Sequence, residues 1–154
     1  MEWVRLPPTA LQSLNKMRFV LDINIIISAL IRENSIIRTV LNVPYFEFFL
    51  PNYAIRELKK NENIILRKSG LKKEELRVLL RLILSKVKII DDKIISPYYK
   101  TAEEIIGKID VKDIPYIALA LAIKNDGVWT SDTHFQRQNK IKIFTTKDIL
   151  EILA

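Results

Sequence analysis

Short apolar runs alternate along the chain with longer segments in which apolar residues recur at helical spacing. The runs with the length and composition of buried strands are residues 18–21, 45–50, 87–90, 128–130 and 142–144. The remaining periodic segments predict helices over residues 25–41 in two pieces, 52–68, 72–86, 97–106, 113–124 and from 146 onward. Strands that alternate with helices are typical of a parallel sheet covered on both faces. The pattern therefore predicts an α/β fold.

The composition agrees with one globular domain and removes several kinds of chemistry. With 154 residues, 49% hydrophobic and 28% charged, the chain can close a core and does not resemble a disordered protein. It has no cysteine, which excludes disulfides, thiol nucleophiles and cysteine-bound metals and is compatible with a cytoplasmic location. The most apolar stretch, residues 19–31, is too short to span a membrane and contains Asp22. We expect a cytoplasmic protein without a membrane segment or secretory signal.

The charge balance favours a polyanionic partner. The formal net charge is +7 and the pI is about 9.6, as is common among nucleic-acid-binding domains. On the predicted helix over residues 52–68, Arg56, Lys59 and Lys60 are candidate RNA contacts. The same side chains would also serve simply to keep an exposed helix face soluble.

Two aspartates directly follow buried strands. Asp22 ends the first apolar run and Asp132 follows the run over residues 128–130. In open parallel sheets, ligands bind beyond the carboxyl ends of the strands. If the first and fourth strands are neighbours, the two carboxylates meet there. The alternative for each Asp is that it starts a turn or caps the next helix.

Two further acids are candidates for the same edge of the sheet. Glu57 lies at the border between the apolar and the wet face of its helix, where an ion pair with Lys60 or a contact with Asn61 is the alternative. Asp113 opens an all-apolar and therefore buried helix. Because Pro115 fits only the first turn, Asp113 is also well placed to be the N-cap of that helix.

Crowded carboxylates repel one another unless a cation lies between them. Oxygen ligands without cysteine favour hard divalent ions such as Mg²⁺ or Mn²⁺. An acidic pocket in a basic protein is the arrangement expected for metal-assisted cleavage of phosphodiesters, because the ion neutralises phosphate charge and basic residues hold the strand.

Four segments resemble, in order, the motifs of PIN-domain ribonucleases. They are residues 19–30 around Asp22, 51–58 around Glu57, 110–120 around Asp113 and 129–135 around Asp132. The resemblance implies a Rossmann-like PIN fold with a five-stranded parallel sheet flanked by helices on both faces. It also implies a Mg²⁺ or Mn²⁺ site and endoribonuclease activity.

The resemblance also assigns roles. Asp22, Asp113 and Asp132 would ligate metal, and Glu57 would be a further ligand or would orient water. Supporting residues of the site would be Asn24, Asp110 and Thr130. Many single-domain relatives are VapC-type toxins, held inactive by an antitoxin and assembled as homodimers, so we expect both partners here. The nuclease domain would span residues 17–154, preceded by an extension of unknown role over residues 1–16.

Three alternatives remain open at this stage. A solitary RNA-processing PIN nuclease would carry the same four acids. A catalytically inactive module that binds RNA or protein would need only the fold. A dehalogenase-like phosphatase is disfavoured, because it requires an Asp where this chain has Asn24. His134, the single histidine, is expected to be a solvated side chain.

Overall fold

Five parallel strands form one sheet in the computed structural model, which describes residues 16–32 and 35–154. The strands are β1 (Met17–Leu21), β2 (Phe46–Pro51), β3 (Val87–Ile90), β4 (Gly127–Trp129) and β5 (Ile143–Phe144), in the order β3-β2-β1-β4-β5. The predicted α/β fold is therefore confirmed, and every predicted strand is present to within one or two residues. Except for Lys16, the predicted N-terminal extension lies outside the described residues.

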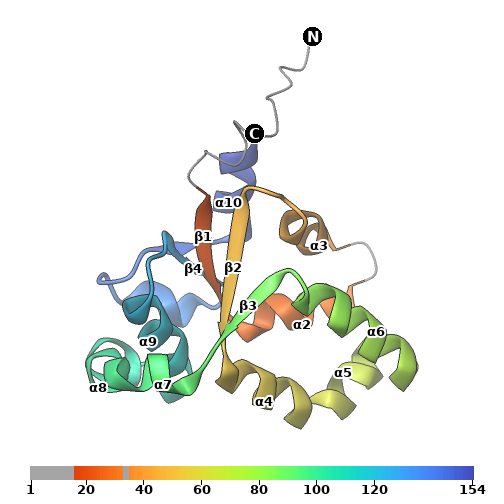
Figure 1. The fold of residues 1–154 in the computed structure, drawn as a ribbon, viewed down its shortest axis with the longest axis horizontal. Helices are drawn as coiled ribbons and strands as arrows, with labels where there is room; N and C mark the ends of the chain where they lie inside the picture. The colour runs from red at the N-terminus through yellow and green to blue at the C-terminus, as the bar shows by residue number, and fades with distance from the viewer. Residues whose placement is uncertain (1–15, 33–34) are drawn as a thin grey trace.

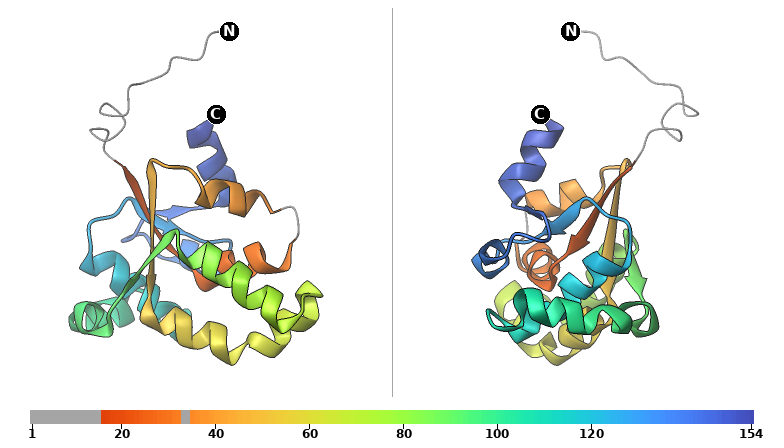
Figure 2. Two further views of the ribbon diagram at one scale, coloured as in Figure 1. Left: turned by 45° about the vertical axis from the view of Figure 1, so that its right-hand side comes forward. Right: turned by 90° about the vertical axis from the view of Figure 1, so that its left-hand side faces the viewer.

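Helices cover the sheet on both sides (Figures 1 and 2). On one side lie α2 (Ile23–Ile31), α3 (Ile36–Leu41), α4 (Asn52–Lys60), α5 (Glu62–Ser69) and α6 (Lys73–Leu84). On the other lie α7 (Asp92–Ile95), η1 (Ser96–Tyr98), α8 (Tyr99–Ala102), η2 (Glu103–Gly107), η3 (Val111–Asp113) and α9 (Ile114–Ala122). The chain closes with η4 (Thr133–Arg137) and α10 (Thr146–Leu153), which packs against β5.

No helix in the described parts of the chain is long and apolar enough to cross a membrane.

Two predicted helices are interrupted in the structure. The helix predicted over residues 52–68 divides into α4 and α5 at Asn61, whose side-chain amide donates to the Glu57 carbonyl at 2.8 Å. The segment predicted as one helix over residues 97–106 begins earlier, at Asp92, and ends in the π-helical turn η2. Side chains that hydrogen-bond the backbone compete with regular helix, which explains the break at Asn61.

The centre of the sheet is covered by packed, buried apolar side chains. Phe19 on β1 is fully buried, and its ring packs edge-on against Phe46 at 5.2 Å and Phe144 at 5.1 Å between centroids. Burying one such side chain contributes roughly 1.5–3 kcal/mol. On the opposite side of the sheet α9 is buried along most of its length. The strand ends that carry the acidic residues therefore follow directly from this packed core.

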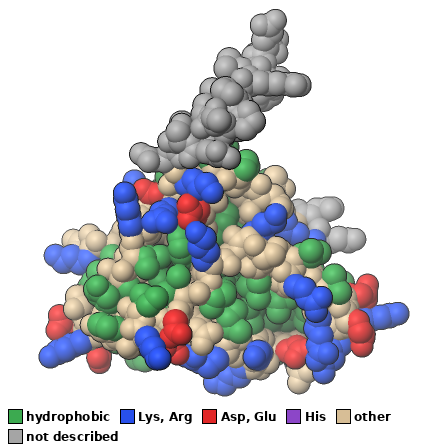
Figure 3. All heavy atoms as spheres, viewed as in Figure 1, with side chains coloured by type: hydrophobic (Ala, Val, Ile, Leu, Met, Phe, Trp, Pro, Cys, Tyr) green, Lys and Arg blue, Asp and Glu red, His purple; other side chains and the backbone are tan. Residues whose placement is uncertain are grey.

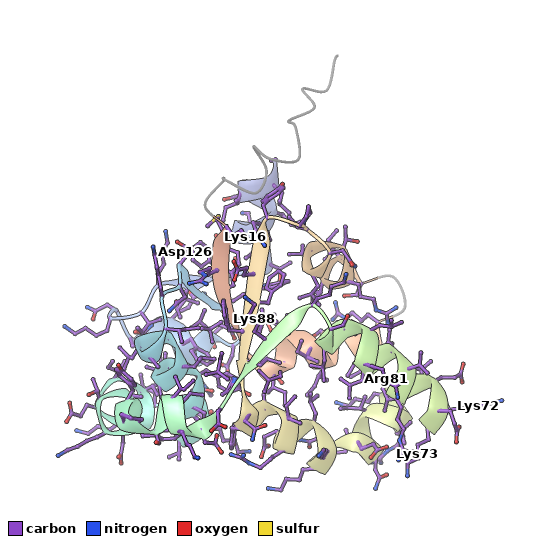
Figure 4. The ribbon with its side chains drawn as sticks, viewed as in Figure 1. Lys16, Lys72, Lys73, Arg81, Lys88 and Asp126 are labelled. Atoms are coloured by element: carbon purple, nitrogen blue, oxygen red, sulfur yellow. The ribbon has the colours of Figure 1, made fainter. Side chains whose placement is uncertain are left out.

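Contacts at the start of β4 help to pair this strand with its neighbours β1 and β5. Asp126 accepts the Arg18 amide N–H through its carboxylate at 2.8 Å and donates its own N–H to the Arg18 carbonyl at 2.8 Å (Figure 4 shows Asp126 beside β1). Gly127 has φ +153°, and a Cβ there would lie 2.5 Å from the Lys142 carbonyl oxygen. Only glycine allows β5 to approach this closely.

Candidate functional site

Asp22 lies at the carboxyl end of β1 and is 2% exposed. Its backbone N–H donates to the Trp129 carbonyl on the neighbouring β4 at 3.1 Å. Its carboxylate accepts the Thr130 hydroxyl at 2.8 Å and the Asn24 side-chain amide at 3.4 Å. Burial raises the pKa of Asp22, and the Thr130 hydrogen bond partly opposes that shift. The structure thus places Asn24 and Thr130 as hydrogen-bond donors to this carboxylate.

Asp132 reaches the same pocket from the next strand. Because β1 and β4 are neighbours, as the prediction required, Asp22 and Asp132 follow adjacent strands. The buried Thr130 oxygen links them, since it donates to Asp22 and accepts the Asp132 backbone N–H at 2.9 Å. Asp132 also caps η4 by accepting the His134 N–H at 2.9 Å. A capping role and a place in the acidic pocket therefore coexist at this position.

Asp113 is not the side-chain cap that its sequence position suggested. The turn η3 extends the helical segment backward, so the capping hydrogen bond passes to Asp110, which accepts the Lys112 N–H at 2.9 Å. Asp113 itself is 5% exposed, makes no side-chain capping bond, and its Oδ2 has no hydrogen-bond partner among the described residues. Burial, followed by the charges of Asp110, Asp132 and Asp22, raises the pKa of Asp113 to about 7.

Four side chains converge closely enough to hold one ion. Asp110, Asp113, Asp132 and His134 each offer a ligand atom, and these atoms lie within 4.8 Å of one another. His134 Nδ1 lies 3.2 Å from Asp110 Oδ2 and 3.5 Å from Asp132 Oδ1. The expectation that His134 is merely solvated is therefore wrong. The only sequence signal for it was its place two residues after Asp132, just beyond a strand end.

The residues present fit a divalent cation. Three carboxylates and one imidazole are ligand types that such ions accept. A buried carboxylate oxygen without a partner, as in Asp113, is costly unless a positive group meets it. The raised pKa of Asp113 likewise shows that the surrounding residues do not stabilise its charged form.

Glu57 on α4 lines the same pocket, which has a volume of about 400 Å³. Its lining includes five carboxylates, two tyrosines and two lysines: Asp22, Glu57, Asp110, Asp113, Asp132, Tyr53, Tyr116, Lys68 and Lys112. Lys60 Nζ lies 4.0 Å from Glu57 Oε1, so the alternative ion pair is also present. That pair is weak, because Lys60 is largely exposed and the distance is long.

The basic residues predicted to contact RNA lie outside the lining of this pocket. Arg56 pairs with Asp92 at 3.0 Å, Lys60 lies beside Glu57, and Lys59 borders a separate apolar groove. Two lysines that sequence reasoning did not single out, Lys68 on α5 and Lys112 on η3, line the pocket instead. Helical periodicity did not reveal this, because it does not tell which helix ends face the carboxyl edge of the sheet.

Fold and site together define a class: a Rossmann-like α/β domain with an acidic pocket at the carboxyl ends of adjacent parallel strands. Within that class, the family described as PIN domain matches residues 20–152. The chain therefore belongs to the PIN-domain family, whose members are in general nucleases. A comparison with curated proteins found no match.

Proposed function

We propose that this PIN domain is a metal-dependent endoribonuclease that hydrolyses RNA phosphodiester bonds at the acidic pocket. Asp22, Glu57, Asp113 and Asp132 are the proposed catalytic carboxylates. The observation that carries the proposal is the buried, unpartnered Oδ2 of Asp113, surrounded by acids from separate elements. In its charged form such a group is costly in a folded protein unless a bound cation compensates its charge.

The proposed cofactor is Mg²⁺ or Mn²⁺. Asp110, Asp113, Asp132 and His134 would hold the ion, and Asp22 and Glu57 border the same space. Bound there, a divalent ion would neutralise phosphate charge and make hydroxide available for attack at neutral pH. The imidazole of His134 favours Mn²⁺ over Mg²⁺, because nitrogen ligands suit transition metals better.

The remaining residues of the site hold the acids in place. Thr130 bonds both Asp22 and the backbone of Asp132, and so fixes the two strand ends relative to each other. Asn24 donates to Asp22 from the first turn of α2. Asp110, itself one of the proposed ion ligands, accepts the Lys112 backbone N–H and lies 3.2 Å from His134 Nδ1, so it would also position the imidazole.

Metal removal tests this function directly. Purified protein is expected to cleave an RNA oligonucleotide with Mg²⁺ or Mn²⁺, to stop when a chelator is added in excess, and to resume when the ion is restored. Cleavage is followed by gel electrophoresis of an end-labelled RNA. Undiminished cleavage in chelator would contradict the proposal and would indicate metal-free chemistry. Binding of RNA without cleavage under any divalent ion would favour the inactive binding module.

The lysines at the pocket are proposed to hold the RNA backbone. The double substitution Lys68→Ala and Lys112→Ala is expected to weaken RNA binding, measured by fluorescence anisotropy in chelator so that the RNA stays intact. The slope of log affinity against log salt should fall by about 1.4, since each phosphate contact on a single strand contributes about 0.7. The matched control is Lys59→Ala with Lys60→Ala, which removes the same charge from α4. An equal or larger loss in the control would assign RNA binding to the face that carries Arg56, Lys59 and Lys60.

A toxin role, with a cognate antitoxin, a homodimer and a cytoplasmic location, is the more specific part of the proposal. Binding of a protein partner, an antitoxin or a second copy, is supported by apolar surface on α6, where Val78 is 53% and Leu82 is 61% exposed. An apolar groove of about 430 Å³ also opens between α2, α4, α5 and α6. Figure 3 shows apolar side chains in this region, and Figure 4 shows Lys72 just before α6 and Lys73 and Arg81 on it.

Two measurements separate the toxin from the solitary RNA-processing nuclease. Expression of a toxin arrests growth of the host cell, and its mass in solution would be that of two chains. Cleavage of RNA in vitro by a monomer that leaves growth unchanged would favour the RNA-processing alternative.

A further inference from the structure

Two buried side-chain atoms lack a hydrogen-bond partner among the described residues, and both belong to the acidic pocket. One is Asp113 Oδ2, a negative acceptor, and the other is the hydroxyl of Tyr116, a neutral donor. Tyr116 lies in the first turn of α9 and is 2% exposed. Because each atom lacks a partner, the two do not bond to each other. The Asp113 oxygen is therefore open to a cation, and the Tyr116 hydroxyl is open to a hydrogen-bond acceptor.

The ring of Tyr116 is firmly positioned. It packs edge-on against Tyr53 at 6.3 Å and against Phe135 at 6.4 Å between centroids. Burial, followed by the charge of Asp22, raises the pKa of Tyr116, and the backbone N–H of Ile23 beside the phenol oxygen only partly opposes that shift, so the phenol keeps its proton. The hydroxyl is therefore a fixed hydrogen-bond donor on the wall of the pocket.

The proton of the hydroxyl has no acceptor among the described residues. A phenylalanine would fill the same space, whereas a buried hydroxyl without a partner costs free energy. A neutral donor also has an advantage over a lysine at this place. A phenol adds no positive charge that would compete with a cation for the pocket acids, and its proton can be donated to an anionic ligand.

We infer that Tyr116 is a substrate-binding residue whose hydroxyl donates a hydrogen bond to a non-bridging oxygen of the RNA phosphate bound beside the acids. This inference rests on the proposed nuclease function. The pocket then offers carboxylates for an ion and one uncharged donor for the phosphate that the ion accompanies.

The conservative change Tyr116→Phe tests this role with three measurements. Metal-free protein should unfold thermally at an equal or higher temperature, since an unpartnered hydroxyl is removed. Mn²⁺ affinity, measured by calorimetry, should be unchanged. The kcat/KM for RNA cleavage should fall roughly 10- to 100-fold, the loss expected for one hydrogen bond to a charged group. Tyr99→Phe is the matched control, because Tyr99 is a partly buried tyrosine outside the pocket lining, and it should change none of the three.

Each other outcome overturns the inference in a recognisable way. Wild-type kcat/KM in Tyr116→Phe would show that the hydroxyl does not contact the substrate. A parallel loss of Mn²⁺ affinity would show that it acts on the acids, and a lower melting temperature would show a structural role. If the wild type binds RNA in Mn²⁺ without cleaving it, the proposed function fails. The affinity of Tyr116→Phe for that RNA then still decides the inference, because it must be weaker than that of the wild type.

Discussion

Asp113→Asn is expected to abolish RNA cleavage while leaving the fold at least as stable at pH 8. The carboxylate is buried and unpartnered, and its pKa is raised to about 7, so at pH 8 the folded protein holds a charge that nothing compensates. An amide removes that charge and cannot replace a carboxylate as a cation ligand. Mutation of a residue that only hydrogen-bonds a metal ligand typically lowers metal affinity or activity 10- to 100-fold. Loss of a ligand itself should therefore lower kcat/KM more than about 100-fold. Cleavage assays and thermal unfolding measure the two effects.

The raised pKa of Asp113 makes the free energy of unfolding depend on pH. The folded-state pKa of Asp113, about 7, exceeds its ordinary value of 3.8, so the folded state binds the proton more tightly. The free energy of unfolding therefore decreases as pH rises from about 4 to about 7 and is constant above that range, as far as this group is concerned. Asp113→Asn removes this dependence. Its gain over the wild type should be larger at pH 8 than at pH 5.

A second carboxylate serves as the control for Asp113. Asp148 forms a capping box with Thr145 at the start of α10, and hydrogen bonds from Thr145 lower the pKa of Asp148. Asp148→Asn should leave cleavage unchanged and should not gain stability at pH 8. Added Mn²⁺ should raise the melting temperature of the wild type and of Asp148→Asn but not that of Asp113→Asn. Full activity in Asp113→Asn would contradict its assignment as a ligand.

Gly127→Ala is expected to cause the largest loss of stability among single substitutions of the small residues in the sheet. Alanine at φ +153° is strained by about 1–3 kcal/mol. Its Cβ would also lie 2.5 Å from the Lys142 carbonyl oxygen and 2.7 Å from the Phe144 ring. The strand β5 would have to move away from β4. We expect a total loss of at least about 3 kcal/mol, measured by urea denaturation.

Gly70→Ala is the matched control for this effect. Gly70 ends α5 in the left-handed region at φ +69°, but a Cβ there would meet nothing within 4 Å. Only the backbone strain remains, which costs about 1–2 kcal/mol. A loss in Gly127→Ala no larger than that in Gly70→Ala would show that β5 yields easily to the added methyl group.

The fold was predictable from the sequence because buried parallel strands leave a local signal. Residues 87–90 and 18–21 are short apolar runs, and the structure places strands there with nearly the same bounds. The neighbouring positions of β1 and β4 were required by the two aspartates but had no signal of their own. The break at Asn61 was missed because the Asn61 side-chain amide and backbone N–H both donate to the Glu57 carbonyl, a contact that apolar periodicity does not reveal.

The acidic residues of the site could be predicted from the sequence, but the contacts between them and their neighbours could not. Asp22 and Asp132 were identified from their positions after strands, and the structure brings both to one pocket. The contact between Asp110, just before η3, and His134 on η4 joins residues 24 positions apart in the sequence. Capping by Asp110 rather than Asp113 depends on the extra turn η3. Such tertiary arrangements override local propensity, so they become visible only in the folded chain.

The sheet order also sets when the acidic pocket can be completed during protein synthesis. The strands β1, β2 and β3 follow one another along the chain, but β1 receives its other neighbour only when β4 has been made. The Thr130 hydroxyl that holds Asp22 comes 108 residues after it, and Asp132 comes two residues later still. Such distant contacts form late, because loop closure must precede them. A nascent chain in which Asp132 has not yet been made therefore lacks a complete pocket, and the proposed nuclease would become able to cut RNA only after the ribosome has passed that residue.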